Sequence, residues 1–150
     1  MKRKDVKRKK IPYVLRLYVL TGRHFPIDNQ ADAAHNLPMP DSIFTKIIEK
    51  KTPATIAYED ERYIAIHDIN PQAPVHLLVV PKRLIASLND LQPGDAELVG
   101  GMYLVAAKLM KDLGQSDYRT IFNCGPGAGQ TVYHIHLHVL AGRPFGWPPG

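Results

Sequence analysis

Two stretches of the chain repeat apolar residues at the spacing of a helix that is buried along one face. The shorter stretch follows Asp41-Ser42, a pair suited to capping a helix N-terminus, and is expected to end before Pro53. The longer one is expected from Pro93, whose missing N–H has no helical partner in a first turn, to a stop at Gly114. Gly100-Gly101 lies in its middle, and close packing against a sheet would explain glycine there. The apolar positions are Ile43, Phe44, Ile47 and Ile48 in the first stretch, and Leu98, Met102, Val105, Leu109 and Leu113 in the second.

Strand-like segments, rich in β-branched and aromatic residues, outnumber these two helices. They cover Thr55–Tyr58, Arg62–Asp68, His76–Val80, Arg119–Asn123 and Thr131–Leu140. Glu59-Asp60-Glu61 separates the first two and suits the turn of a hairpin, while Pro71 and Pro74 make the following loop rigid. Because the strands mostly follow one another along the chain, the pattern predicts an α+β domain built on an antiparallel sheet.

The last of these strands has an unusual polar face. Successive side chains of a strand point to opposite faces, so His134, His136 and His138 are expected on one face. The other face would be apolar and would carry Tyr133, Ile135, Leu137 and Val139. Three interpretations are open at this point: zinc bound by imidazoles, nucleophilic catalysis by a neutral imidazole, or a histidine cluster without chemistry.

The loop before the histidines favours phosphate over a metal. It runs Asn123-Cys124-Gly125-Pro126-Gly127-Ala128-Gly129-Gln130-Thr131, and its small residues let backbone N–H groups approach an anion closely. Gln130 and Thr131 add hydrogen-bond donors next to the histidines. No acidic side chain follows that would orient a metal-bound imidazole. Phosphate chemistry is therefore the preferred interpretation, with a metal site as the alternative.

The basic charge of the chain is confined to its N-terminal part. Residues 1–40 hold nine Lys and Arg against three Asp, whereas residues 41–150 hold ten basic residues against eleven acidic ones. Residues 41–150 therefore lack the basic excess of a nucleic-acid-binding domain. The single cysteine, Cys124, rules out a disulfide within the chain, and no apolar run approaches the roughly 20 residues that span a bilayer.

Residues 1–40 are interpreted as a mobile basic extension that precedes one domain over residues 41–150. Residues 2–10 are typical of nuclear-import or polyanion-binding clusters. An organellar presequence is the alternative for the extension. The lack of a disulfide suits a reducing compartment, so the expected location is the cytoplasm, with entry into the nucleus through residues 2–10 as a further hypothesis.

Residues 129–139, Gly-Gln-Thr-Val-Tyr-His-Ile-His-Leu-His-Val, resemble the signature of the histidine-triad (HIT) family of nucleotide hydrolases and transferases. Asp41–Phe44, Ile66–His76 and Trp147–Gly150 resemble its Hint branch, the histidine triad nucleotide-binding proteins. His138 and Trp147 distinguish the chain from the galactose-1-phosphate uridylyltransferase and Fhit-like branches. The resemblance covers residues 41–150 and implies a HIT-like fold, a five-stranded antiparallel sheet with one long and one short helix, extended across a homodimer.

The resemblance implies a hydrolase that cleaves the P–N bond of purine nucleoside 5′-phosphoramidates and releases AMP or GMP, with no metal or other cofactor. His136 would attack the α-phosphorus and carry the nucleotide covalently until water releases it. His134 would orient His136 through its backbone carbonyl. His138 and the backbone of residues 129–131 would hold the phosphoryl oxygens, and Thr131 would hydrogen-bond the leaving amine.

The nucleotide pocket follows from the same resemblance. Asp68 would accept the two ribose hydroxyls, and Asn123 would lie near the phosphate. His76 would support the histidines, and Trp147 would reach toward the site across the dimer interface. An apolar slot for the purine, with plain core packing as the alternative for each residue, would consist of Phe44, Ile47, Ile66 and Ile69.

Two other functions stay open beside the phosphoramidase. One is a nucleotide-binding interaction module with little catalysis, and the other is a zinc-dependent hydrolase. Cys124 and Pro126 depart from the residues usual in the family's loop, and Pro126 removes one N–H donor. These departures bear on the choice of leaving group more than on the reaction.

Overall fold

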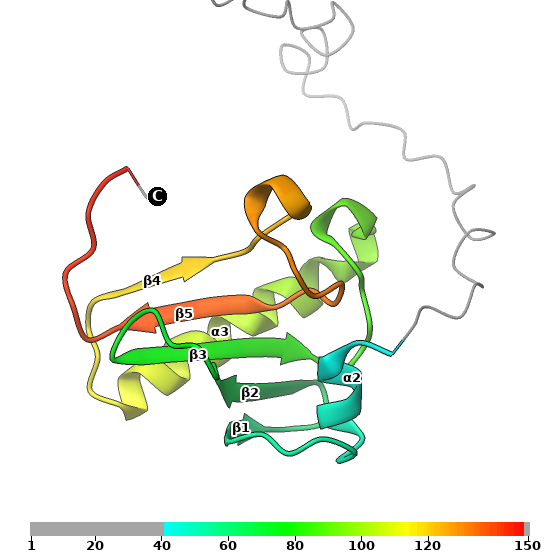
Figure 1. Ribbon diagram of the computed structural model, residues 1–150, viewed down its shortest axis with the longest axis horizontal. Helices are drawn as coiled ribbons and strands as arrows, with labels where there is room; N and C mark the ends of the chain where they lie inside the picture. Colours follow the sequence, from blue (N-terminus) through cyan, green and yellow to red (C-terminus); the bar gives the residue numbers. More distant parts are fainter. Residues whose placement is uncertain (1–40, 149–150) are drawn as a thin grey trace, which may run out of the picture. The chain divides into compact units, whose positions relative to one another are not determined.

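Residues 41–148, the part of the chain that the computed structural model describes, form one sheet with helices packed on it (Figure 1). In chain order the elements are α2 (Ile43–Ile48), β1 (Ile56–Glu59), β2 (Tyr63–His67), β3 (Val75–Pro81), α3 (Ala96–Asp112), β4 (Tyr118–Ile121) and β5 (Leu137–Ala141). The connections of this part contain the 3-10 turns η2 (Leu88–Asp90), η3 (Pro93–Asp95) and η4 (Pro126–Ala128). The predicted basic extension, residues 1–40, and residues 149–150 lie outside the described residues. No helix within 41–148 is long and apolar enough to cross a membrane.

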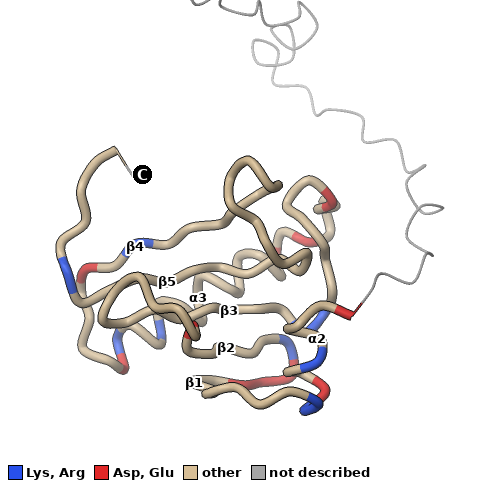
Figure 2. Tube along the Cα trace, in the orientation of Figure 1, with Lys and Arg blue, Asp and Glu red and all other residues tan. Residues whose placement is uncertain are grey.

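The sheet has the strand order β1-β2-β3-β5-β4, and every neighbouring pair is antiparallel. The hairpin between β1 and β2 forms where predicted, because Asp60 accepts hydrogen bonds from the backbone N–H groups of Arg62 and Tyr63. Figure 2 shows that β3 and β5 carry no Lys, Arg, Asp or Glu. Within residues 41–148, the expected α+β fold with five antiparallel strands, one long helix and one short helix is confirmed.

α3 covers one face of the sheet with the apolar stripe that its spacing predicted. Leu113, the last predicted position, is instead exposed because the helix ends at Asp112. Pro93 begins η3 rather than α3, and the Asp95 side chain there accepts the N–H of Gln92. The core on this face joins Leu98, Met102, Val105, Leu109 and Met110 of α3 to Leu77, Val79, Leu137 and Val139 of the central strands.

The glycine pair inside α3 has two different environments. A Cβ added at Gly101 would collide with the Tyr63 hydroxyl and lie 2.7 Å from its Cζ, so the predicted close packing against the sheet is confirmed there. At Gly100 an added Cβ would meet no atom within 4 Å, and the same prediction is wrong. Gly114 follows the helix with φ of 66°, which is the predicted glycine stop.

The opposite face of the sheet carries α2 and the polar part of the central strands. Ser42 caps α2 as predicted, since its Oγ accepts the N–H of Thr45 at 3.1 Å. α2 buries Phe44 and Ile47 against this face, in a cluster with Ile64, Ile66, Leu78 and Val80. His76 alternates with the α3-facing residues of β3, so it shares this second face with Leu78 and Val80.

β5 is shorter than the predicted strand Thr131–Leu140, and of the three histidines only His138 lies in it. The preceding residues do not continue the sheet because their hydrogen bonds go elsewhere, as when the N–H of Ile135 donates to the carbonyl of Ile85 at 2.7 Å. The predicted apolar face holds for Ile135, Leu137 and Val139, which are buried in the core under α3. It is wrong for Tyr133, whose side chain is half exposed.

Candidate active site

Four histidine rings gather on the sheet face that bears α2. Between ring centroids, His138 lies 4.9 Å from His136 and 5.2 Å from His76. Phe44 packs against the ring of His136 at 5.0 Å and that of His134 at 6.1 Å. The term histidine cluster is used below for His76, His134, His136, His138 and the neighbouring Asp68.

His134 is fully buried, and both of its ring nitrogens are hydrogen-bonded. Nε2 lies 2.8 Å from the carbonyl oxygen of Pro81, which can only accept, so Nε2 carries the proton. Nδ1 therefore accepts the hydroxyl of Ser42, at 3.1 Å. The cap of α2 is thus tied to the histidine segment, and His134 has no ring nitrogen left for chemistry.

His136 differs because only one of its nitrogens has a partner within residues 41–148. Nδ1 lies 2.8 Å from the carbonyl oxygen of His134, so Nδ1 carries the proton and Nε2 keeps a lone pair. No buried side-chain nitrogen or oxygen of the described residues lacks a hydrogen-bond partner, so the unpaired Nε2 must reach solvent. The contact expected from the His134 carbonyl is present, and it leaves one accessible basic nitrogen.

A hydrogen bond joins His138 to His76, and the carboxylate of Asp68 lies beside His76. Nδ1 of His138 lies 2.9 Å from Nε2 of His76, and the same Nε2 lies 3.4 Å from Oδ2 of Asp68. Nδ1 of His76 accepts the backbone N–H of Gln72 at 3.1 Å, and Oδ1 of Asp68 accepts that of Asn70 at 2.8 Å. The loop between β2 and β3 therefore orients both side chains.

Burial keeps the imidazoles of the histidine cluster neutral. It lowers the pKa of His76, His134 and His136 below the usual value of 6.5. It lowers the pKa of His138 to about 4, and the neighbouring rings of His136 and His76 add to the effect. At pH 7 these rings are therefore uncharged, as a nucleophilic imidazole must be.

The glycine-rich loop does not present the backbone amides that its composition predicted. Residues 125–130 close around η4, where Gly125 and Gly129 adopt φ of 79° and 82°, values that favour glycine. The N–H groups of Gly129 and Gln130 donate to the carbonyls of Pro126 and Gly125. The prediction that these two amides hold phosphoryl oxygens is therefore wrong in this loop conformation, and the N–H of Thr131 is the remaining candidate.

The side chain of Gln130 is buried and satisfied within the protein. Its Oε1 accepts the N–H of Gly125 at 2.9 Å. Its Nε2 donates to the carbonyls of Ala86 at 2.7 Å and Val132 at 3.1 Å. The predicted role of this side chain as a phosphate donor is corrected: it holds the loop against the segment that follows β3.

The other residues predicted to bind the nucleotide are buried to different degrees. Phe44, Ile47 and Ile66 lie in the core cluster under α2, in agreement with the core-packing alternative, and Phe44 also contacts two histidine rings. Asn123 is half-buried and lies 3.5 Å from the carbonyl of Gly129. The exposed residues of the set are Ile69, Thr131 and Trp147. Their roles toward a nucleotide stay predictions.

A metal ion held by Asp68, His76 and His138 together does not fit the hydrogen bonds of His76. Asp68, His76 and His138 are the one group within residues 41–148 whose donor atoms, all within 4.8 Å of one another, could hold a metal. A metal-bound imidazole donates the N–H of its other nitrogen to an acceptor. His76 cannot do so, because its other nitrogen accepts the N–H of Gln72. His134, with both nitrogens occupied, cannot supply a ligand in its place.

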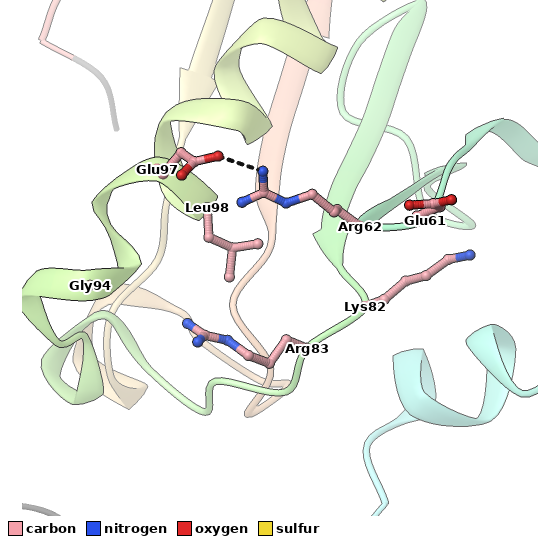
Figure 3. A pocket seen from close by; sticks show the side chains of 7 residues that line it. All are labelled: Glu61, Arg62, Lys82, Arg83, Gly94, Glu97 and Leu98. Carbon is pink, nitrogen blue, oxygen red and sulfur yellow. Dashed lines mark hydrogen bonds and ion pairs between the residues drawn. The ribbon is translucent and has the colours of Figure 1, made fainter.

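A concave region lies beside the first turn of α3, and no histidine lines it (Figure 3). Each of its cations has a carboxylate partner: Arg62 with Glu97, Lys82 with Glu59, and Arg83 with Asp95. None of its lining cations is therefore left without a carboxylate for a phosphate to bind. The term charged pocket is used below for this cavity of about 300 Å³, lined by Glu61, Arg62, Lys82, Arg83, Gly94, Glu97 and Leu98.

Three supporting residues of the cluster were not predicted in these roles. Ser42 was expected only as a helix cap. Its hydrogen bond to Nδ1 of His134 could not be predicted, because only the fold brings the two residues together. Gln72 acts through its backbone N–H, which carries no sequence signal because nearly every residue has one. Arg143 donates to the carbonyl of Gln72 from Nε at 3.3 Å and Nη2 at 3.2 Å, and thereby holds that loop.

Comparison with known proteins agrees with this geometry. Residues 41–144 match the family described as "Scavenger mRNA decapping enzyme C-term binding". An uncharacterized HIT-like protein from Synechocystis is 50% identical over 111 residues, which are 73% of this chain and 97% of that protein. The 14 kDa zinc-binding protein of Zea mays is 46% identical over 112 residues, 73% of this chain and 88% of that protein. A HIT family hydrolase from Legionella pneumophila has a similar structure, with a TM-score of 0.70 and 48% identity, covering 72% of this chain and 98% of that one.

The family match includes the whole histidine cluster. Residues 41–144 contain every strand of the sheet and all members of the histidine cluster. The similarity to the Legionella hydrolase extends over nearly all of that protein. The chain therefore belongs to the histidine-triad (HIT) family, among whose members it is similar to proteins named as hydrolases.

Proposed function

We propose that this chain cleaves the P–N bond of purine nucleoside 5′-phosphoramidates and releases AMP or GMP, without a metal ion. The observation that carries the proposal is the accessible Nε2 of His136, whose ring is neutral and whose proton is held on Nδ1 by the His134 carbonyl. An imidazole in this state is a nucleophile at pH 7. The hydrogen bonds of His76, which exclude a zinc ligand there, support the metal-independent form.

In the first step Nε2 of His136 attacks the α-phosphorus, and the bond from phosphorus to the leaving amine breaks. The amine leaves neutral after it takes a proton from solvent, relayed by the hydroxyl of Thr131. The nucleotidyl-imidazole is then positively charged, and the His134 carbonyl stabilises it by accepting the Nδ1–H. In the second step water attacks the phosphorus, the bond to His136 breaks, and the nucleoside monophosphate leaves with one released proton.

The nucleoside half of the substrate is assigned to the loop after β2. Asp68 would accept the ribose hydroxyls, because its side chain is a carboxylate at the border of the histidine cluster and is still partly accessible. Ile69, which follows it, is fully exposed and offers apolar surface that a purine ring would cover. Phe44 is buried and packs against the ring of His136, to which it offers apolar surface.

A homodimer is part of the same proposal. β4 is an edge strand of the described sheet, and an unpaired strand edge is a surface on which a second copy can continue the sheet. Trp147, which is 86% exposed, would then be available to the partner's site. A cytoplasmic or nuclear location, and contact of residues 2–10 with a polyanion or an import receptor, stay predictions.

The test is release of AMP from adenosine 5′-phosphoramidate, followed by chromatography, with the covalent intermediate located by mass spectrometry. His136→Ala is expected to lower turnover at least about 10³-fold, since it removes the nucleophile. His67→Ala is the matched control, because strand alternation turns His67 toward the α3 face, away from the cluster.

Two outcomes would contradict the proposal. Full activity of His136→Ala, with a folded protein by circular dichroism, would remove the nucleophile assignment. AMP binding without turnover, over a panel of amine leaving groups, would favour the interaction module.

A further inference from the structure

The ring nitrogens of His136 and His138 have different hydrogen-bond partners, and these partners determine which nitrogen of each ring carries the proton. For His136 the partner of Nδ1 is a carbonyl, which only accepts, so Nε2 is the basic nitrogen. For His138 the partner of Nδ1 is another imidazole, His76, so its state depends on which of the two rings donates. The environment of His76 decides this.

His76 has a fixed tautomer because its Nδ1 faces a backbone N–H. The amide of Gln72 can only donate, and it lies 3.1 Å from Nδ1, so Nδ1 has to be the unprotonated nitrogen. A neutral imidazole carries its one proton on the other nitrogen, so Nε2 of His76 is the donor. A backbone amide does not titrate, and this assignment therefore holds as long as the loop is folded.

The proton on Nε2 of His76 points to His138. Nδ1 of His138 lies 2.9 Å away, whereas Oδ2 of Asp68 lies 3.4 Å away, so the imidazole is the closer acceptor. Nδ1 of His138 then accepts, and the proton of His138 has to be on its Nε2. Within residues 41–148 the Nε2 of His138 makes no hydrogen bond, so its N–H is left for a ligand.

The geometry points to His76 as a positioning residue that fixes His138 as an N–H donor beside the nucleophilic nitrogen of His136. The two rings, 4.9 Å apart between centroids, would present one lone pair and one N–H to the same substrate. The lone pair suits the phosphorus, and the N–H suits a phosphoryl oxygen that gains charge in the transition state. This role rests on the proposed function, but the tautomer itself does not.

Arg143 extends the chain of contacts to the segment after β5. Its guanidinium donates twice to the carbonyl of Gln72 and lies 4.4 Å from the ring centroid of Phe145. The preceding Gly142 has φ of 87°, and an added Cβ there would lie 2.9 Å from Pro74 in the same loop. Residues 142–143, which follow β5, thus hold the loop between β2 and β3 whose Gln72 amide sets the tautomer of His76.

The direct test needs no substrate. In 15N-labelled full-length protein, long-range 1H–15N correlation spectra distinguish protonated from unprotonated ring nitrogens, and His138→Gln assigns the resonances of His138. We expect a protonated Nε2 and an unprotonated Nδ1 for His138, and the reverse pattern for His136. A His138 with its proton on Nδ1 overturns the inference, whether or not the protein releases AMP.

Substitution of His76 tests whether the donor matters for catalysis. His76→Gln keeps an N–H donor near the position of Nε2, so the His138 tautomer is expected to persist and kcat to fall less than roughly 10-fold. His76→Leu removes the donor, and we expect both tautomers of His138 and a loss of kcat of roughly 100-fold with little change in KM. Equal kcat values for Gln and Leu, or a His138 tautomer that is unchanged in the Leu variant, would show that His76 only fills space. If the Leu variant does not fold, the wild-type spectra and His76→Gln still decide the matter.

Discussion

The histidine cluster and the charged pocket both gather titratable side chains, but their polar atoms have different kinds of partners. In the charged pocket each cation meets a carboxylate, for example Arg62 with Glu97 at 2.7 Å. In the histidine cluster the partners are mostly backbone groups, which fix ring orientation without adding charge. One nitrogen each of His136 and His138 is left without a partner among the described residues.

The difference teaches which arrangement can act on a substrate. A cation that is paired with a carboxylate has to break that pair before it binds a phosphate. An imidazole that the protein holds through Nδ1 keeps Nε2 free to contact a substrate. A cavity by itself does not identify the site here, because the charged pocket is lined by no histidine. The states of individual nitrogen atoms identify it.

Substitution of His134 is expected to have the largest effect on the stability of the protein. His134→Ala removes a fully buried ring, leaves the Pro81 carbonyl and the Ser42 hydroxyl without their partner, and opens a void beside Phe44. We expect the free energy of unfolding to fall by about 2–4 kcal/mol, measured by urea denaturation. His136→Ala should cost less, because its ring reaches solvent and has one protein hydrogen bond. A larger loss of unfolding free energy for His136→Ala than for His134→Ala would contradict the assignment of His134 as the structural ring and His136 as the catalytic one.

Packing at the wall of the charged pocket gives the next largest effect. Tyr63 donates to the carbonyl of Leu98, a residue that lines the pocket, and Gly101 leaves room for its hydroxyl. Gly101→Ala is expected to displace Tyr63 and lower the free energy of unfolding by about 1–3 kcal/mol. Gly100→Ala is the matched control, because the added methyl meets open space and should raise stability by up to about 1 kcal/mol through helix propensity. Equal effects in the two variants would contradict the contact with Tyr63.

The histidine cluster and the charged pocket are expected to lose their contributions to stability over different pH ranges. Burial lowers the folded-state pKa of the cluster histidines below 6.5, so the unfolded chain binds protons that the folded chain does not. Their contribution to stability is therefore complete above pH 6.5 and is lost as the pH falls toward about 4, the pKa of His138. For His138 alone, after allowance for its partial exposure, the loss is about 1–2 kcal/mol. Glu59, the partner of Lys82 from the charged pocket, loses its pairing at a lower pH, because the hydrogen bond from Lys82 holds its pKa below 4.5.

Thermal unfolding in buffers between pH 8 and pH 4 measures this window. His138→Gln is the matched control, because it removes the ring with the largest shift, and its melting midpoint should fall less over the same range. A melting midpoint of the native chain that stays constant down to pH 5 would contradict the neutral, buried state of the cluster.

The elements of this fold could be predicted from the sequence where the apolar pattern and a local cap agree. Ser42 followed by apolar residues at helical spacing predicted α2, and the long stripe with its glycine stop predicted α3. The strand boundary at β5 could not be predicted, because alternation continues through residues 134–136 while the partner of His134 is a carbonyl 53 residues earlier in the chain. Alternation records which side chains are buried, and it does not record which backbone groups they meet.

The same limit applies to the site. Three histidines and a glycine-rich loop predicted phosphate chemistry, but composition could not show that the amides of Gly129 and Gln130 are used to close η4. Nor could it show that a backbone N–H at Gln72 sets the state of a histidine ring. The residue types of a site can be predicted from sequence. The protonation of each atom depends on partners that only the folded chain brings together.

The smallest effect is expected for a substitution in the charged pocket. It tests whether this pocket contributes to activity at all. Arg62→Ala removes the hydrogen bond to Glu97 and the contact of the guanidinium with the Tyr63 ring, at 5.7 Å from its centroid. Both charged side chains are well exposed, and exposed ion pairs contribute little because water solvates the separated charges almost as well. We expect the melting midpoint and the rate of AMP release to match those of the native chain within the reproducibility of each assay, with Glu97→Gln as the matched partner variant. A loss of AMP release comparable with that of His136→Ala would move the active site to the charged pocket, where no histidine could serve as the nucleophile.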